Sequence, residues 1–323
     1  MTQQSKQPPS DRTGDVVLRA LAISCVILIH VLSSIQPSPF YENSGVWQWI
    51  VIGLDQAARI SVPLFVALSG YGLWRGYGQK LSAAGALPFL YRRVHKLVPA
   101  YVLWSFVFAV VFFFFPNWTT PETQPSFPWQ LVWGRADYHL YFVPMILQLY
   151  LLFPVLAWLQ RRWPAVLLLG ALALQLGWYA YYSYGEHVPL DLVFFKGDSE
   201  QYLWSPNWTW YFVLGMQLPA ISQWLGRRVL ARGGIAMVAV GVWLALVVNA
   251  VTAINSGVDP LLALRFTRYE IVLFASLAIV SLLTWAHTVR HIPRSVQWLS
   301  DWSYHLYLSH TLFLRVIFNI LLR

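Results

Sequence analysis

RALAISCVILIH, residues 19–30, is a largely apolar stretch with an arginine at one end and a histidine at the other. On an α-helix, eleven residues advance about 1,100°, so Arg19 and His30 share one face and lie roughly 16 Å apart along the axis. An ionisable side chain inside an apolar span costs about 2.5 to 3.5 kcal/mol on insertion scales, and such a residue commonly has a function. The stretch therefore predicts a membrane helix with Arg19 near a membrane edge and His30 near mid-bilayer.

The composition of the whole chain indicates a polytopic membrane protein. Of its 323 residues, 58% are hydrophobic and only 11% are charged, whereas about a quarter of the residues of a soluble domain are charged. We expect one all-α transmembrane bundle of residues 15–323, preceded by a flexible cytoplasmic arm of residues 1–14, which is polar and contains prolines. The single cysteine, Cys25, excludes a multi-cysteine metal site, and no metal is expected.

Apolar runs of bilayer length, about 20 residues each, predict nine spans. These are residues 16–35, 46–73, 97–115, 139–158, 164–184, 207–225, 234–254, 268–286 and 302–321. The second run is long enough to break or re-enter around Pro63 and Gly70. Because the loop near 187–206 contains the apolar stretch VPLDLVFF, ten spans are an alternative.

The distribution of charge predicts the orientation of these spans. With a cytoplasmic N-terminus, 15 of the 22 lysines and arginines fall in cytoplasmic segments, and acidic residues such as Glu122, Asp137 and Asp259 gather on the opposite side. This asymmetry follows the positive-inside rule. The net charge of +9 therefore reflects topology and not a nucleic-acid partner, and we expect a multi-pass protein of the inner (plasma) membrane.

Several ionisable side chains inside the predicted spans need partners or functions. They are His30, Asp55, Arg59, Glu270, His305, His310 and Arg315. For a lone membrane histidine such as His30, the alternative to a functional role is a neutral imidazole bonded to a neighbouring helix. In the last span, Ser303, Tyr307 and His310 follow i, i+4, i+7 spacing and line one polar face.

The segment YRRVHKLVPAYVLW brings Arg92, Arg93, His95 and Lys96 together just before the third span. On composition they are explained first by ordinary anchoring at the cytoplasmic surface, and alternatively by an electropositive rim that binds the phosphates of an acyl-CoA. Arginine suits the second role because its planar fork makes bidentate contacts. The sequence of this segment leaves both explanations open.

Together these segments resemble the membrane acyltransferase 3 family, integral-membrane O-acyltransferases that modify cell-surface polysaccharides and other envelope molecules. GDVVLRALAISCVILIH is similar to the opening D-x-x-R-x10-H pattern, and FVALSGYGL to the Ser-Gly-aromatic motif. YRRVHKLVPAY is similar to the Arg-Arg-x3-basic-x2-Pro-x-Tyr motif, and SYHLYLSH to the terminal Ser-Tyr-x3-Leu-x-His motif. The four motifs occur in the family's order across almost the whole chain. One departure is Tyr141, which precedes Phe142 where the family commonly has tryptophan.

The resemblance implies an acyl-CoA donor, most simply acetyl-CoA, and an acceptor hydroxyl on a surface glycan or a lipid-linked saccharide. Arg19, Ser69, Arg92, Arg93 and Lys96 are the implied donor-binding residues. His30 either accepts a proton from the acceptor hydroxyl or carries the acyl group itself, and the sequence leaves both mechanisms open. Glu270 and His310 are candidates for orienting the His30 imidazole in catalysis.

The main alternative is a non-enzymatic exporter or transporter of polysaccharide or lipid-linked sugar. In that case Asp55, Arg59 and Glu270 would line a pathway. The shared face of Arg19 and His30 and the basic segment favour an enzyme, because a sugar conduit requires neither. The expected partners are the acceptor and membrane lipids, and the oligomeric state is left open, a homo-oligomer included.

Overall fold

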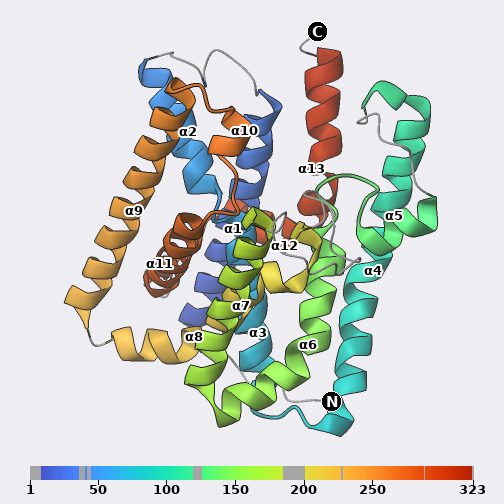
Figure 1. The fold of residues 1–323 in the computed structure, drawn as a ribbon. Helices are drawn as coiled ribbons and strands as arrows, with labels where there is room; N and C mark the ends of the chain where they lie inside the picture. Colours follow the sequence, from blue (N-terminus) through green and yellow to red (C-terminus); the bar gives the residue numbers. More distant parts are fainter. Residues whose placement is uncertain are drawn as a thin grey trace. The chain divides into compact units, whose positions relative to one another are not determined.

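The computed structural model describes residues 9–35, 41, 45–118, 126–184, 201–226, 228–286 and 288–321, and over these ranges the chain is helical with no strand (Figure 1). The prediction of an all-α protein is confirmed for this part of the chain. Helix α1 (Pro9–Ser34) begins inside the segment predicted as a flexible arm, and the first eight residues of that arm lie outside the described ranges.

The described chain forms two compact units, each assembled from segments that are distant in sequence. The first unit contains Met1–Tyr71 and Gln217–Tyr307, and the second contains Gly72–Met216 and Leu308–Arg323. Each unit therefore depends on packing between its earlier segment and its later segment.

In the first unit, α1 packs against α2 (Val46–Ala58), α11 (Tyr269–Ala286) and α12 (Arg294–Asp301). Helix α9 (Val229–Asn255) packs against α2, α11 and the short α10 (Pro260–Ala263). The α2–α9 contact buries Ile52 and Ala250 completely, and the Trp243 indole of α9 donates to the Gly53 carbonyl of α2 at 3.0 Å. Apolar burial and one directional bond thus fix α2 against α9.

The second predicted span is interrupted, as its length indicated. Helix α2 ends at Ala58, turn residues Arg59 and Ile60 follow, and α3 (Ser61–Leu73) then continues. Pro63 lies in the first turn of α3, where its missing N–H breaks no intrahelical bond, whereas Gly70 lies within α3. The interruption places Arg59 at the junction, a few residues after Asp55 and Gln56, which are both completely buried.

The second unit is built around α4 (Ala83–Phe114), which packs against α5 (Phe127–Trp133) and α6 (Phe142–Arg162), and α6 packs in turn against α7 (Pro164–Tyr184). Buried rings of Phe89, Phe153 and Phe212 join α4, α6 and the first half of α8 (Thr209–Gly226). The unit also contains the short helices η1 (Trp74–Gly78), η2 (Pro116–Trp118), η5 (Gln201–Leu203) and η6 (Ser205–Asn207), and the end of α13 (Ser303–Val316) with η7 (Ile317–Leu321).

Seven helical segments of the described chain are long and apolar enough to cross a membrane. They are Thr13–Ser34, Val46–Gly78, Ala84–Phe114, Phe142–Arg162, Pro164–Tyr182, Val229–Asn255 and Tyr269–Ala286. These correspond to seven of the nine predicted spans. The other two predicted spans correspond to α8 and α13, which are not among these seven segments. A total of nine or ten spans and the side of the N-terminus stay predictions.

Candidate functional site

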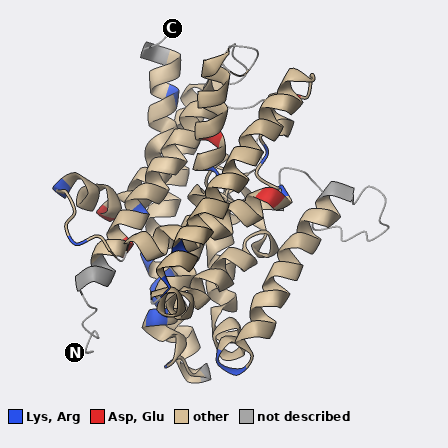
Figure 2. Cartoon of the chain, turned by 90° about the vertical axis from the view of Figure 1, so that its left-hand side faces the viewer, with Lys and Arg blue, Asp and Glu red and all other residues tan. Residues whose placement is uncertain are grey.

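Charged residues form a small part of the chain (Figure 2), and three clusters of the described ones lie inside or beside apolar helices. One cluster contains Asp55, Arg59 and Arg268 in the first unit. A second is the basic segment on α4, and a third surrounds Asp137, both in the second unit. Because burying a charge is costly unless it is paired, the partners of Asp55 and Asp137 show how the chain compensates that cost.

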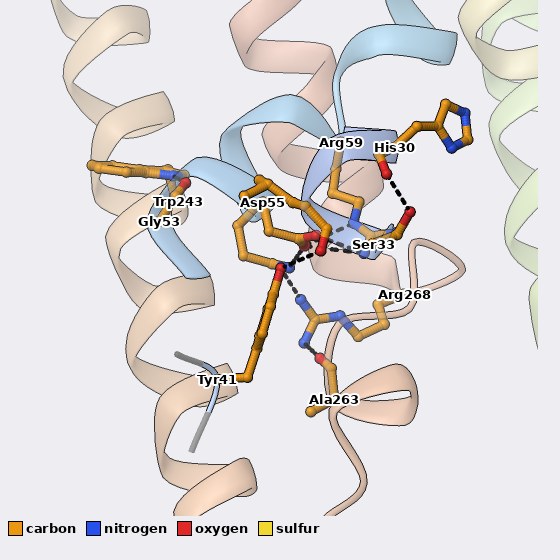
Figure 3. A network of polar contacts seen from close by, with 11 residues as sticks. His30, Ser33, Tyr41, Gly53, Asp55, Arg59, Trp243, Ala263 and Arg268 are labelled. Carbon is orange, nitrogen blue, oxygen red and sulfur yellow. Dashed lines mark hydrogen bonds and ion pairs between the residues drawn. The ribbon is translucent and has the colours of Figure 1, made fainter. Parts of the chain in front are cut away.

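Helix α1 carries Arg19 and His30, as predicted. The Arg19 side chain is exposed and His30 is half-buried. The hydroxyls of Ser33 and Ser34 both donate to the His30 carbonyl, at 3.0 and 2.7 Å, which satisfies a carbonyl near the C-terminal end of α1. Figure 3 shows the His30 imidazole pointing away from the Asp55–Arg59 pair, so this pair does not orient the ring.

The cluster beside α1 is centred on Asp55, whose side chain is completely buried. Arg59 donates to both carboxylate oxygens of Asp55, from Nε at 3.0 Å and from Nη2 at 3.1 Å. Gln56 adds a third bond from its Nε2 to Oδ1 at 3.0 Å. Three donors, two of them charged, therefore offset the cost of burying this carboxylate.

Arg268, which directly precedes α11, joins this cluster through Gln56. Its Nη2 donates to Gln56 Oε1 at 2.5 Å, and its Nη1 donates to the Ala263 carbonyl of α10 at 3.0 Å (Figure 3). The predicted orienting residue Glu270 is exposed in the first turn of α11 and acts electrostatically on Arg268. The role of Glu270 beside His30 stays a prediction.

The predicted basic segment lies on the first half of α4, and its residues differ in environment. Arg92 and Lys96 are exposed, whereas Arg93 is half-buried, with its guanidinium 5.2 Å from the Tyr77 ring centre and 5.5 Å from that of Phe89. Nε of Arg93 is buried and has no hydrogen-bond partner in the described chain.

A further arginine reaches the same region from another helix. Arg161, near the end of α6, donates to the Gly78 carbonyl of η1, and η1 also carries Tyr77. Cations from α4 and α6 therefore flank η1, which is an arrangement that can bind phosphate groups. The sequence indicated Arg92, Arg93 and Lys96 but gave no reason to group Arg161 with them.

Ser69, the other predicted donor-binding residue, lies on α3 in the first unit. Its hydroxyl donates to the Phe65 carbonyl one turn earlier at 2.9 Å, a common arrangement for serine within a helix. A hydroxyl in this position remains an acceptor. Its part in donor binding stays a prediction.

The third cluster surrounds Asp137 in the connection between α5 and α6. Arg315 of α13 donates from Nη2 to Asp137 Oδ1 at 2.6 Å, and Thr311 donates from its hydroxyl to Oδ2 at 2.7 Å. His139 Nδ1 lies 3.4 Å from Oδ2. Burial disfavours the ionised carboxyl, but the bond to His139 and the charges of His139 and Arg315 hold the pKa of Asp137 below its usual value.

His139 links this cluster to the predicted catalytic residue His310. The two rings meet edge to face with centres 4.9 Å apart, and both side chains are buried. Nε2 of His139 also lies 3.4 Å from the Leu308 carbonyl. The His310 side chain of α13 is thus buried against His139. His305, on another face of the same helix, is exposed.

Gly134 gives this connection its shape. It ends α5 in the left-handed conformation, with φ of 65°, and a Cβ at this position would lie 2.6 Å from Tyr141 Cα. Only glycine fits both constraints. The turn therefore directs the chain from α5 into the short segment that carries Asp137 and His139.

The predicted site residues divide between the two units. Arg19, His30, Ser69 and Glu270 belong to the first unit, and the second contains Arg92, Arg93, Lys96 and His310. Within units, α1 joins Arg19 to His30, and α4 joins the three basic residues. The meeting of the two groups around one substrate stays a prediction.

The sequence does not reveal the polar partners that come from connections between helices. Asp137 was predicted only as one of several acidic residues on the non-cytoplasmic side, and His139, Gln56 and Arg268 were not singled out. The cost of burying a charge implies that Arg315 and Arg59 have partners, but the sequence does not show which residues these are. Within the described residues, no group of three His, Cys, Asp or Glu side chains is arranged to hold a metal ion.

Comparison with known proteins identifies the class to which this fold and these residues belong. The chain is a member of the acyltransferase 3 family, whose acyltransferase domain matches residues 17–323. The chain is also similar to the succinoglycan biosynthesis protein ExoH of Rhizobium meliloti (strain 1021), with 31% identity over 170 residues, which are 49% of this chain and 45% of ExoH. The match thus spans about half of either protein. No solved structure gives a significant match.

Proposed function

We propose that this protein is a membrane O-acyltransferase that moves an acyl group, most simply acetyl, from acyl-CoA to a hydroxyl of a surface polysaccharide or its lipid-linked precursor. The family match over residues 17–323 carries this proposal. The similarity to a protein named for succinoglycan biosynthesis supports a saccharide acceptor. The cations that flank η1 support a donor with phosphate groups.

In the proposed reaction, His30 acts at the reacting atoms. As a general base, its imidazole takes the proton of the acceptor hydroxyl while the hydroxyl oxygen attacks the thioester carbonyl, and CoA leaves as a thiolate that is then protonated. As a nucleophile, the imidazole first takes the acyl group from CoA and then passes it to the acceptor. Both routes use the same partially accessible side chain on α1.

His30→Ala tests the proposal, with His305→Ala as a matched histidine control. We expect His30→Ala to abolish O-acylation of surface glycan in a complemented deletion strain. Membrane insertion and protein level should stay near normal, because the half-buried ring is not part of the Asp55 pair. His305→Ala should retain activity. Full activity of His30→Ala at wild-type protein level would remove His30 from the reaction, and a wild-type protein that neither binds nor hydrolyses acetyl-CoA would contradict the function.

A further inference from the structure

The cluster around Asp55 contains more positive than negative charge. Two guanidinium groups, Arg59 and Arg268, surround one completely buried carboxylate (Figure 3). Arg59 donates to both oxygens of Asp55, whereas Arg268 donates to the neutral amide of Gln56, which in turn donates to Asp55. Glu270 and Arg265, both exposed, also act on Arg268, and Glu270 is the strongest of the charges around it. Counted with these two residues, the cluster holds three guanidinium groups and two carboxylates.

The hydrogen bonds of Arg268 are also incomplete. Its two terminal nitrogens donate to Gln56 and Ala263, but its Nε is buried and has no hydrogen-bond partner in the described chain. A buried donor without a partner is destabilising. The Nε edge of a guanidinium matches the paired oxygens of a carboxylate or a phosphate, so an anion placed there would correct both the charge imbalance and the missing bond.

We propose that Arg268, with Arg59 beside it, forms a binding site for an anionic group of the acceptor, either the carboxylate of an acidic sugar or the phosphate of a sugar phosphate. The proposal rests on the proposed function, because that function supplies a saccharide acceptor. The predicted orientation places residues 255–267 on the non-cytoplasmic side, where the acceptor is expected. Arg59 keeps 16% of its side chain exposed, and Arg268 is half-buried, so part of each side chain is accessible to a ligand.

The test measures the binding of small probes to the purified full-length protein in lipid nanodiscs, with CoA present at saturation to occupy the phosphate-binding donor site. The probes are methyl β-D-glucuronide, glucose 1-phosphate and, as the neutral match, methyl β-D-glucoside. Affinity is obtained from the rise of the unfolding midpoint with probe concentration at fixed ionic strength. The variants are Arg268→Gln, Arg268→Lys and the matched control Arg265→Gln, which changes an exposed arginine of the same connection.

We expect the wild type and Arg265→Gln to bind at least one anionic probe roughly tenfold tighter than the glucoside, because a charge-assisted pair is lost with the neutral sugar. Arg268→Gln should lose this preference. The ratio of the two anionic probes distinguishes a carboxylate acceptor from a phosphate acceptor. Arg268→Lys should weaken the preference for the anionic probe, since lysine keeps the charge without the planar fork. If Arg268→Gln does not fold, Arg268→Lys alone tests whether Arg268 binds the anion.

Two results would overturn the proposal: no anion preference in the wild type, or a preference that both Arg268 variants retain. The CoA titration of the same samples reports separately on the proposed function. A wild-type protein that binds the anionic sugars but not CoA would contradict the acyltransferase function while keeping the anion site. A protein that binds CoA without preferring anionic sugars would contradict the anion site alone.

Discussion

Arg92 and Arg93 are neighbours in sequence with different surroundings. Arg92 is exposed, with its guanidinium 5.9 Å from the Tyr77 ring centre, whereas Arg93 is half-buried over both Tyr77 and Phe89. A guanidinium that lies over a ring contributes packing as well as charge. Arg93 is therefore expected to serve both the structure of η1 and donor binding, and Arg92 donor binding alone.

Replacing these arginines should separate the two roles. We expect Arg92→Gln to weaken acetyl-CoA binding about tenfold or more, since a charge-assisted contact contributes about 1.5 to 3 kcal/mol, without changing the unfolding midpoint. The double variant with Arg93→Gln should bind donor still more weakly and unfold at lower temperature. Isothermal titration and thermal unfolding of the purified proteins measure both effects. The control is Arg228→Gln, which removes an arginine from over Trp224. Unchanged donor affinity in the double variant would leave the segment as a membrane anchor.

At the level of elements, the connection between α5 and α6 is attached to the end of α13 by Asp137. Its carboxylate accepts bonds from Arg315 and Thr311, and Arg315 also donates to the Trp118 carbonyl of η2. The Asp137–Arg315 pair thus joins three separate segments of the second unit: the α5–α6 connection, α13 and η2. Removing one partner of a buried ion pair leaves the other uncompensated.

Asp137→Asn should therefore lower the free energy of unfolding by about 3–5 kcal/mol. The pH dependence has a defined sign: the folded pKa of Asp137 lies below its usual value of 3.8, so its contribution is present above that pH and is lost as the pH falls through the folded pKa. Thermal unfolding between neutral and acidic pH should show the variant less sensitive to acid than the wild type.

The control for this variant is Asp301→Asn, because Asp301 is exposed and its carboxylate accepts a hydrogen bond from Gln297 of the same helix. It should unfold like the wild type at every pH. If Asp137→Asn matched the wild type in stability, the ion pair with Arg315 would not be holding α13 in place.

Gly134 is a second point at which this connection depends on one residue. We expect Gly134→Ala to destabilise the protein by about 1–3 kcal/mol, because the left-handed backbone is unfavourable for alanine and its Cβ would meet backbone atoms of Tyr141 and Leu140. Thermal unfolding measures the loss. Gly170→Ala is the control, since Gly170 lies within α7 and has no atom within 4 Å of an added Cβ; equal effects of both changes would argue against the strained turn.

At the scale of the whole molecule, the predicted orientation separates donor from acceptor. With the orientation expected from the charge asymmetry, Arg19, Arg92 and Arg93 would lie on the cytoplasmic side, where CoA is made, and the acidic connections on the other side. His30 lies roughly 16 Å along α1 from Arg19, about half of a 30 Å hydrocarbon core. A polar cleft open at both ends around His30 is therefore expected.

Vesicles of known orientation test this arrangement. With radiolabelled acetyl-CoA on the side of the cytoplasmic segments and an impermeant saccharide acceptor trapped on the other, label should appear on the trapped acceptor. The His30→Ala protein in the same vesicles controls for leakage. Label found only on acceptor placed together with the CoA would exclude transfer across the membrane and leave an ordinary one-sided acyltransferase.

The sequence by itself determined the class of fold, because apolar runs of bilayer length and a low content of charge can be satisfied only by membrane helices. It also determined the shared face of Arg19 and His30 and the basic group on α4, since residues on one helix are related by a fixed rotation and rise. These predictions needed no contact between distant segments.

Only the tertiary structure decided which residues compensate the buried charges. Asp137 meets Arg315 from 178 positions away, and Gln56 meets Arg268 from 212 positions away. Periodicity describes one helix at a time and carries no information about such pairs. The connections before α6 and α11, which supply Asp137, His139 and Arg268, have no repeating pattern to read. Their roles follow from packing, which brings a polar group from an irregular segment to the place where a helix buries its charge.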